Sequence, residues 1–345
     1  MKKLFTLAFA LVFSTGLAFA QNNDASITQD GDDNDAKITQ AQYSENSDHS
    51  QTQDGDRNFA RAVSYADDIM GIQVQEGDDN DSRLNQASAG GSAETYQYGD
   101  EQVARVKQAG GSGNFAMVRQ GAQGVGTSFQ NTAGVLQSGA SNDVEVVQKG
   151  EGNDLGTNWW TNPGIEQLGD GNEALVQQIG DYNVADVLQD GNDNKAVERM
   201  TSGDRNLVTI DQLGDDNRAV YEIWGDDNDI DVDQTGSDHD VYVNGRGTPL
   251  APGGGVSNNV VDIDQFGGDG NSLRGYLGNG SESNTITIQQ EGSSNAVAGT
   301  FGPSGDYGLF VDGDFNTVDV MQSGMDNTAQ VQAVGNNNTA VVDQQ

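Results

Sequence analysis

Carboxylate side chains are the first candidates for chemistry, because they cluster in short acidic segments. The segments DGDDND at 30–35 and DGNDN at 190–194 place several oxygen ligands close together, as a calcium site requires. An EF-hand loop also needs glycine at its sixth position and glutamate at its twelfth. The first segment has Asp35 and Ala41 there, and the second fails in the same way. We therefore interpret these acids as turn residues, loosely screened by salt or divalent ions at most, and predict no metal site.

Histidine, cysteine and tryptophan give little indication of catalysis. His49 and His239 are the only histidines, there is no cysteine, and neither histidine has a second base or metal ligand beside it in the sequence. His239 stands where asparagine recurs elsewhere in the chain. We predict a protein that is not an enzyme, with no catalytic residue and no cofactor. Trp159, Trp160 and Trp224 suggest carbohydrate stacking only weakly.

Primary amides offer a different chemistry, which is hydrogen bonding along a row of identical side chains. The phrase Gln-x-Gly occurs fifteen times in the chain. An amide both donates and accepts hydrogen bonds, so equivalent amides in stacked strands can form a ladder that satisfies groups which would be costly to bury. We predict that this ladder also carries assembly. Its predicted members are Asn23, Gln29, Gln53, Gln75, Gln97, Gln108, Gln137, Gln148, Asn172, Gln178, Asn183, Gln189, Asn194, Gln212, Gln234, Gln265, Gln290, Gln322 and Gln344.

The amides belong to an eleven-residue repeat that indicates β-strands. In GNEALVQQIGDYNVADVLQDGNDN, residues 171–194, the phrase Asn-x-Ala-x-Val-x-Gln-x-Gly starts at Asn172 and again at Asn183. The shared residues fall on every second position, which is the strand period, and valine and isoleucine favour strands. Glycine tolerates positive φ, and Asp and Asn favour turns. The predicted turn glycines include Gly31, Gly180, Gly191 and Gly214.

Two copies of the repeat would form one strand-arc-strand rung, and rungs would stack about 4.8 Å apart. We count roughly 28 strand-sized units, which predicts an all-β solenoid of about fourteen rungs with a cross-β spine of roughly 65–70 Å. The phrase resumes after each of four interruptions, so we predict one domain over 21–345. We expect the interruptions to be enlarged loops, near 121–130, 156–163, 244–258 and 299–306.

Composition restricts the partners. The chain of 345 residues has 53 Asp plus Glu against 16 Lys plus Arg, a formal charge of −37, with 47 glycines and 4 prolines. Such a chain repels nucleic acid and anionic lipid, so neither is expected as a partner. Low hydrophobicity with high charge is typical of disorder, but the tandem repeat favours a folded solenoid instead.

Residues 1–20, MKKLFTLAFALVFSTGLAFA, have the pattern of a secretory signal peptide, with cleavage expected before Gln21. No later segment is apolar enough for a transmembrane helix. The repeat begins at Asn23 and still runs at Gln344, with no capping element at either end. We therefore expect both ends to bind further copies, and changes at Gln29 or Gln344 to slow elongation more than a change at Gln178.

The tandem phrase Gln-x-Gly-x-x-Asn-x-Ala behind a signal peptide resembles the curlin repeat of curli fibre subunits. The resemblance covers nearly the whole chain after residue 20. It implies a functional amyloid of the Gram-negative cell surface, exported through an outer-membrane pore, nucleated by a minor subunit, and active in biofilm and adhesion as a pilus-like fibre. The tail NNNTAVVDQQ has no basic residue, so the chain is more similar to a major subunit.

One alternative comes from another class of protein, a monomeric secreted β-solenoid adhesin that binds ice, glycan or another surface. An ice-binding face needs a uniform outward row such as repeated threonine. The outward residues of successive copies are mixed here, for example Asp24, Ser26 and Thr28 in one copy and Glu173 and Leu175 in another. The mixture favours a structural polymer.

Overall fold

A computed structural model describes residues 22–41, 44–121, 128–156, 163–200, 203–245, 255–278, 280–300 and 307–345. The expected signal peptide, 1–20, lies outside these residues, as do Trp159 and Trp160. Every element within them is a β-strand, and all strand pairs are parallel. The predicted all-β solenoid is therefore confirmed. None of the described residues forms a helix long and apolar enough to cross a membrane.

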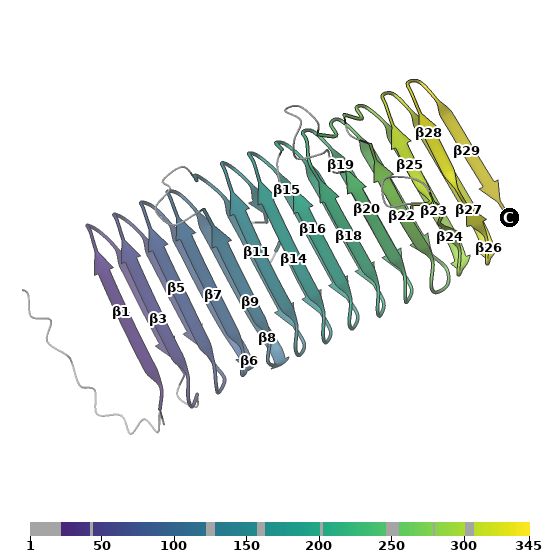
Figure 1. Cartoon of the computed structure of the whole chain (residues 1–345). Coiled ribbons are helices and arrows are strands. Elements are labelled where there is room, and N and C mark those ends of the chain that lie inside the picture. The colour runs from purple at the N-terminus through teal and green to yellow at the C-terminus, as the bar shows by residue number, and fades with distance from the viewer. Residues whose placement is uncertain are drawn as a thin grey trace, which may run out of the picture.

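The strands alternate between two sheets that face each other (Figure 1). Sheet A has fifteen strands: β1 (Asp24–Asp30), β3 (Asp48–Asp54), β5 (Met70–Glu76), β7 (Ser92–Tyr98), β9 (Phe115–Gln120), β11 (Asp143–Lys149), β14 (Glu173–Ile179), β16 (Lys195–Met200), β18 (Arg218–Ile223), β20 (Asp240–Gly245), β22 (Ser272–Leu277), β24 (Ala296–Val297), β25 (Leu309–Asp312), β27 (Thr328–Ala329) and β28 (Val331–Val334).

Sheet B has fourteen strands: β2 (Asp35–Gln40), β4 (Phe59–Ser64), β6 (Asp81–Ala89), β8 (Val103–Ser112), β10 (Thr132–Ser138), β12 (Asp154–Leu155), β13 (Ile165–Leu168), β15 (Val184–Asp190), β17 (Leu207–Leu213), β19 (Asp229–Thr235), β21 (Val260–Phe266), β23 (Thr285–Ser293), β26 (Thr317–Met325) and β29 (Thr339–Gln344).

We call one strand position of sheet A together with the next of sheet B a level. The path through each sheet has thirteen positions, so the described residues form thirteen levels and not the fourteen expected. The difference arises because two insertions lie inside strands. Leu155 pairs with Ala133 and Ile165 with Val135, so β12 and β13 share one level. In the same way β24 and β25 both pair with β22.

The predicted interruptions are described only at their edges. Residues 122–127, 157–162, 246–254 and 301–306 lie outside the described part. Phe129 forms parallel bridges to Asp100 and Glu151 and so belongs to the repeat. The intervals 157–162 and 301–306 each interrupt a strand, whereas 122–127 and 246–254 each follow one. Gly134, which faces the first intra-strand insertion, lacks room for a Cβ because the carbonyl oxygen of Pro163 would lie 2.6 Å from it.

Alternation along each strand separates core from surface. In β14, Ala174, Val176 and Gln178 are buried, while Glu173 is exposed and the other residues are half-buried. Small and medium aliphatic side chains from both sheets form one continuous hydrophobic core along the axis. The same inward rows carry asparagine and glutamine, so the core is a thin layer in which apolar and amide rows run side by side.

The arcs need glycine for a steric reason as well as a conformational one. Gly180, Gly191 and Gly214 have φ of 123°, 141° and 119°, and Gly31 has 109°. A Cβ on any of them would lie about 2 Å from a backbone oxygen of the next level. All four predicted turn glycines therefore lie where two levels approach most closely.

Candidate functional site: amide ladders and open edges

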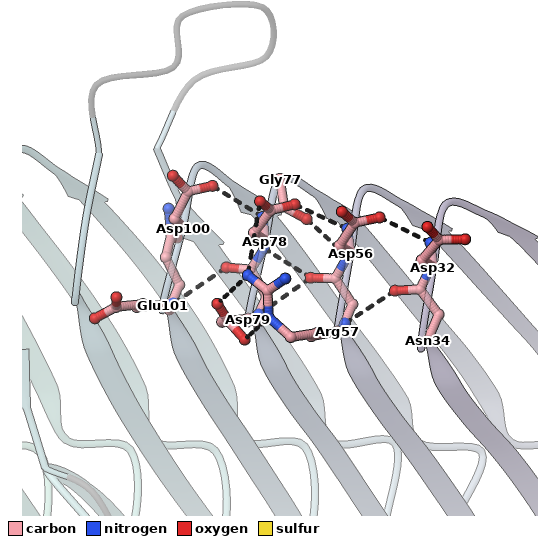
Figure 2. A network of polar contacts seen from close by, with 12 residues as sticks. Asp32, Asn34, Asp56, Arg57, Gly77, Asp78, Asp79, Asp100 and Glu101 are labelled. Carbon is pink, nitrogen blue, oxygen red and sulfur yellow. Dashed lines mark hydrogen bonds and ion pairs between the residues drawn. The ribbon is translucent and has the colours of Figure 1, made fainter.

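The acidic arcs bond to one another along the axis (Figure 2). The Asp56 carboxylate accepts a hydrogen bond from the backbone N of Asp32 at 2.7 Å. Asp78 accepts from Asp56 N at 2.8 Å, and Asp100 accepts from Asp78 N at 2.8 Å. These carboxylates thus act as backbone acceptors between levels. Among the described residues no cluster of three or more His, Cys, Asp and Glu is placed to hold a metal.

One arginine relieves part of this acidic row. Arg57 makes a bidentate contact to Asp79, with Nε and Nη2 at 2.8 and 2.7 Å from its two oxygens (Figure 2). The hydrogen bond from Arg57 lowers the pKa of Asp79. Arg205 and Asp227 repeat the arrangement further along the solenoid. Both pairs are exposed to solvent.

Glutamines of sheet A form the first ladder. Each donates from Nε2 to the Oε1 of the glutamine on the next level, over distances of 2.7 to 3.0 Å. The series runs through Gln29, Gln53, Gln75, Gln97, Gln120, Gln148 and Gln178. Beyond it the same position holds Met200 and then Ile223, so this ladder stops at mid-chain.

Glutamines of sheet B form a second ladder, which runs from the third level to the last. Its bonds have the same direction and span 2.7 to 3.3 Å. Its members are Gln86, Gln108, Gln137, Gln167, Gln189, Gln212, Gln234, Gln265, Gln290, Gln322 and Gln344. Gln29 and Gln344, which we expected on the two terminal rungs, lie on the first and last levels, in sheet A and sheet B respectively.

Asparagines at the start of the strands form two further rows with the opposite bond direction. The backbone N of Asn194 donates to Oδ1 of Asn172, and the backbone N of Asn183 to Oδ1 of Asn153, each at 3.0 Å. The amide nitrogens also reach a glycine carbonyl of the next level, as Asn172 Nδ2 does to Gly191 O at 2.9 Å. Asn23 begins one row, where its Oδ1 accepts from Ser47 N at 2.9 Å.

Five ladder glutamines were not among the predicted members, and one of them, Gln167, does have the following x-Gly. Gln86 and Gln120 lack the following x-Gly, although the alternate-residue pattern from Asn80 and Asn114 leads to them. Gln51 and Gln73 occupy an aliphatic row, where Gln51 Nε2 donates to Gln73 Oε1 at 2.6 Å. Only the register of the sheet identifies this last pair. The assembly role of all these amides stays a prediction.

His239 replaces an asparagine and performs part of its role. Its backbone N donates to Asn217 Oδ1 at 3.1 Å, and its Nδ1 accepts from Asn271 N at 3.2 Å. Burial lowers the pKa of His239, which favours the neutral ring that this acceptor needs. His49 is also buried, and Gly71 leaves space for its ring. Both histidines are therefore part of the core.

Glu198 is the anomaly in the core. It occupies the inward row between Val176 and Tyr221, is 1 % exposed, and neither carboxyl oxygen has a hydrogen-bond partner among the described residues. Burial, with a smaller effect from Asp186, raises its pKa well above the usual range. The hydroxyl of Tyr221 is likewise buried without a partner. Among the described residues no base is hydrogen-bonded to Glu198, so we assign it no catalytic role.

The two end levels expose groups that the inner levels bury. Ile27 of β1 is 46 % exposed, whereas Val118 and Val135 at equivalent inward positions are fully buried. At the last level, no described residue donates to Oδ1 of Asn338. At the first, the backbone N of Asn34 and the carbonyl of Gly31 have no described partner. Inner levels join the equivalent groups to each other, so the two ends are complementary.

The family model for the curlin associated repeat matches residues 165–197, 203–236 and 313–345. These three segments are curlin repeats. Proteins built from curlin repeats are the secreted, extracellular curli proteins, a structural and non-enzymatic kind related to amyloid. No curated protein matches the chain.

The matched segments include parts of both sheets. The first extends from β13 into β16, the second contains β17 to β19, and the third contains β26 to β29. The third also includes the edge at which Asn338 and Gln344 lie. Trp224 lies directly after β18 and is half-buried.

Proposed function

We propose that this chain is the structural subunit of extracellular, curli-like amyloid fibres that grow end to end in a biofilm matrix and in adhesion. In this proposal the edge formed by β27, β28 and β29 of one copy pairs in parallel with the edge formed by β1 and β2 of the next. Residues 1–20 act as the signal peptide. The polymer is a homopolymer, with a minor nucleator subunit and an outer-membrane secretion pore as further partners.

The single observation that carries the proposal is the complementarity of the two end levels. Asn338 Oδ1 is the acceptor that the backbone N of Asn34 in the next copy needs, and the carbonyl of Gly31 would accept from Asn338 Nδ2. Inner levels make both contacts, as Asn172 shows with Asn194 N and Gly191 O. Continuing sheet B in register sets Gln344 against Gln40 of the next copy. This is strand addition to an open edge.

Backbone geometry supplies a specific test at Val341. Thr317 N donates to Asn338 O at 2.8 Å, so the backbone of Asn338 faces β26. Successive residues of a strand point to opposite edges, and the N–H of Val341 therefore points to the open edge. Its side chain is 66 % exposed. Val341→Pro removes an edge donor without removing a bond inside the chain, whereas Val341→Ala keeps the donor.

We expect Val341→Pro to slow fibre growth by at least about tenfold, equivalent to about 1.4 kcal/mol, because proline removes a ladder hydrogen bond and is excluded from strands paired on both sides. Val341→Ala should grow like the parent. Thioflavin fluorescence and electron microscopy of residues 21–345 measure growth, and circular dichroism checks that both variants keep their strands. Equal growth of the proline and alanine variants would exclude end-to-end pairing at β29. A parent chain that stays monomeric in all salts would favour the monomeric adhesin.

A further inference from the structure

The inward row of sheet A that carries the first glutamine ladder changes its chemistry along the solenoid. It consists of amides from Gln29 to Gln178. On the levels after Gln178 the row holds, in order, Met200, Ile223, Gly245, Leu277, Val311 and Ala333. β1 and β29 lie at opposite ends of the structure (Figure 1). One end of this row therefore presents a glutamine, and the other end presents an alanine.

Gln29 uses only one side of its amide within the ladder. Its Nε2 donates to Oε1 of Gln53 at 2.7 Å, and Gln53 Nε2 donates in turn to Gln75 Oε1 at 2.8 Å. Each inner glutamine oxygen thus accepts from the preceding level. At the first level no described residue donates to Oε1 of Gln29, whose side chain is exposed. In a single copy this acceptor faces solvent, and it needs a donor once the edge is covered.

Ala333 is the residue that would meet Gln29 if a second copy continued sheet A in register. Ala333 lies six residues after Asn327, and Gln29 lies six residues after Asn23. Both asparagines belong to the row that starts the strands of sheet A. Ala333 points inward and is 3 % exposed. Its methyl group cannot donate a hydrogen bond, so joining two copies covers Gln29 Oε1 without supplying a donor.

The other three amide rows end and begin with residues of the same kind. Their pairs across the junction are Gln344 with Gln40, Asn338 with Asn34, and Asn327 with Asn23. Inside the chain the matching contacts are formed, since Gln322 Nε2 donates to Gln344 Oε1 at 2.8 Å and Asn327 N donates to Asn295 Oδ1 at 3.2 Å. The two ends are therefore complementary in three rows, and the mismatch is confined to the glutamine row of sheet A.

The position of the unmatched acceptor decides what it weakens. A buried acceptor without a donor costs free energy wherever it lies. Inside the chain, covalent arcs connect neighbouring levels and hold them together despite such a cost. No covalent bond crosses the junction between two copies, so the cost at Gln29 reduces their association directly. An edge with an inward glutamine in place of Ala333 would supply the missing donor.

We propose that Gln29 limits the end-to-end association of this chain, because Ala333 of the next copy covers its Oε1 and leaves it without a donor. This inference rests on the proposed fibre function. The junction between copies is then the weakest level of the fibre. The edge that fits β1 best is one whose last sheet A strand carries an inward glutamine, which a second copy of this chain lacks. Replacing Gln29 should strengthen the fibre, the opposite of the direction expected from the sequence.

Gln29→Met tests the proposal in residues 21–345, with Gln75→Met as the matched control. Gln29→Met removes the acceptor at the edge and moves the unmatched oxygen to Gln53, inside the chain. Gln75→Met leaves Gln97 Oε1 without its donor, while Gln29 keeps its own unmatched oxygen. The concentration of soluble chain left in equilibrium with fibres should be at least about tenfold lower for Gln29→Met, equivalent to 1.4 kcal/mol. Equal concentrations, or a higher one for Gln29→Met, would overturn the proposal.

Fibre breakage gives a second measurement, which needs only the parent and Gln29→Met and so survives if Gln75→Met fails to fold. Under constant shear, fibres of Gln29→Met should break at least about tenfold less often than parent fibres, as electron microscopy of their lengths would show. Equal breakage, with growth that Val341→Pro still blocks, would overturn this inference and leave the fibre proposal standing. A parent and a Gln29→Met chain that both form no fibres would overturn the two proposals together.

Discussion

Sheets A and B stack over the same thirteen levels but are stabilised in different ways. Inside sheet B the glutamine ladder continues to Gln344, while that of sheet A ends at Gln178 and is followed by apolar residues. Outside, sheet A pairs its charges between adjacent levels, as in Lys195 with Glu173 at 2.6 Å and Arg218 with Asp240 at 2.8 Å. Sheet B has such pairs only around Asp81, with Arg83 and Arg105, among the described residues. Further along it, Asp231 and Asp262 stand side by side without an ion pair in the described part of the chain.

The comparison shows that an uninterrupted amide ladder is not required on both sides of the core. An amide in such a row needs a partner on each side, whereas an apolar residue needs only contact. Sheet A can therefore change from amide to apolar at Gln178, whose Nε2 donates to the backbone carbonyl of Asn183 at 3.2 Å in place of a next glutamine. It also tolerates Glu198, a buried carboxyl that is not apolar and has no hydrogen-bond partner among the described residues.

The largest effect is expected from exchanging the two kinds of residue on the eighth level, where Gln212 of β17 and Met200 of β16 occupy equivalent positions. Gln212 accepts from Gln189 and donates to Gln234, each at 2.8 Å. Gln212→Met keeps the volume but leaves Gln234 Oε1 without its donor. We expect a loss of about 2–3 kcal/mol in the free energy of unfolding, because an unsatisfied buried group costs about 1–3 kcal/mol.

The reverse change, Met200→Gln, is the matched control. Its amide can accept from Gln178 but meets Ile223 on the next level, so we expect a loss of about 1 kcal/mol. Urea unfolding of the soluble chain, monitored by circular dichroism before fibres appear, measures both. Equal losses for the two variants would contradict the distinction between the sheets.

The next largest effect is expected at Glu198, and it depends on pH. Because burial raises the pKa of Glu198 in the fold, folding favours the protonated carboxyl. Stability from this group is intact below the unfolded pKa of about 4.3 and is lost as pH rises toward the folded pKa. Glu198→Val should therefore stabilise the chain at pH 7 by about 1–3 kcal/mol.

The gain from Glu198→Val should shrink on going from pH 7 to pH 4, and thermal unfolding at both values measures it. Glu198→Gln separates charge from polarity. Its gain over the parent should shrink toward pH 4 as that of valine does, because only the parent carries the ionisable group, but it should stabilise less than valine, since a buried amide still lacks a partner. A gain independent of pH in both variants would show that Glu198 is not ionised by unfolding.

The smallest effect is expected from the outer pairs of sheet A. Lys195→Ala removes the contact to Glu173, in which both side chains are 40 % or more exposed. Exposed ion pairs contribute about 0.2–1 kcal/mol, so the loss should be near the lower end and vanish in 0.5 M salt. Urea unfolding at low and high salt measures it. A larger, salt-independent loss in the free energy of unfolding would mean that packing of the Lys195 side chain on the outer face of sheet A stabilises the fold.

The strand period, the inward face and the arcs were all predictable from residues 171–194. Each follows from local chemistry, namely alternation along a strand and the steric freedom of glycine in the arc. Because the eleven-residue step is half a rung, consecutive copies were expected to meet equivalents one rung away and not each other. The end of the sheet A ladder at Gln178, where Met200 and Ile223 follow, was not predicted.

Other features depend on long-range register. The expected fourteen rungs became thirteen levels because two insertions lie inside strands. At the first, β12 and β13 are the two halves of one strand position. Glu198 follows the inward pattern, but its isolation depends on Val176 and Tyr221 beside it. The row of outward basic residues on sheet B can be recognised only when Arg61 and Arg83, 22 residues apart, are known to be adjacent.

The opposite directions of the two amide rows determine which acceptor is left at each end of the stack. Glutamine oxygens face the preceding level, as Gln212 Oε1 does toward Gln189, whereas asparagine oxygens face the following one, as Asn172 Oδ1 does toward Asn194. A column of any length built this way therefore ends in a glutamine acceptor at the edge of β1 and in an asparagine acceptor at the edge of β29.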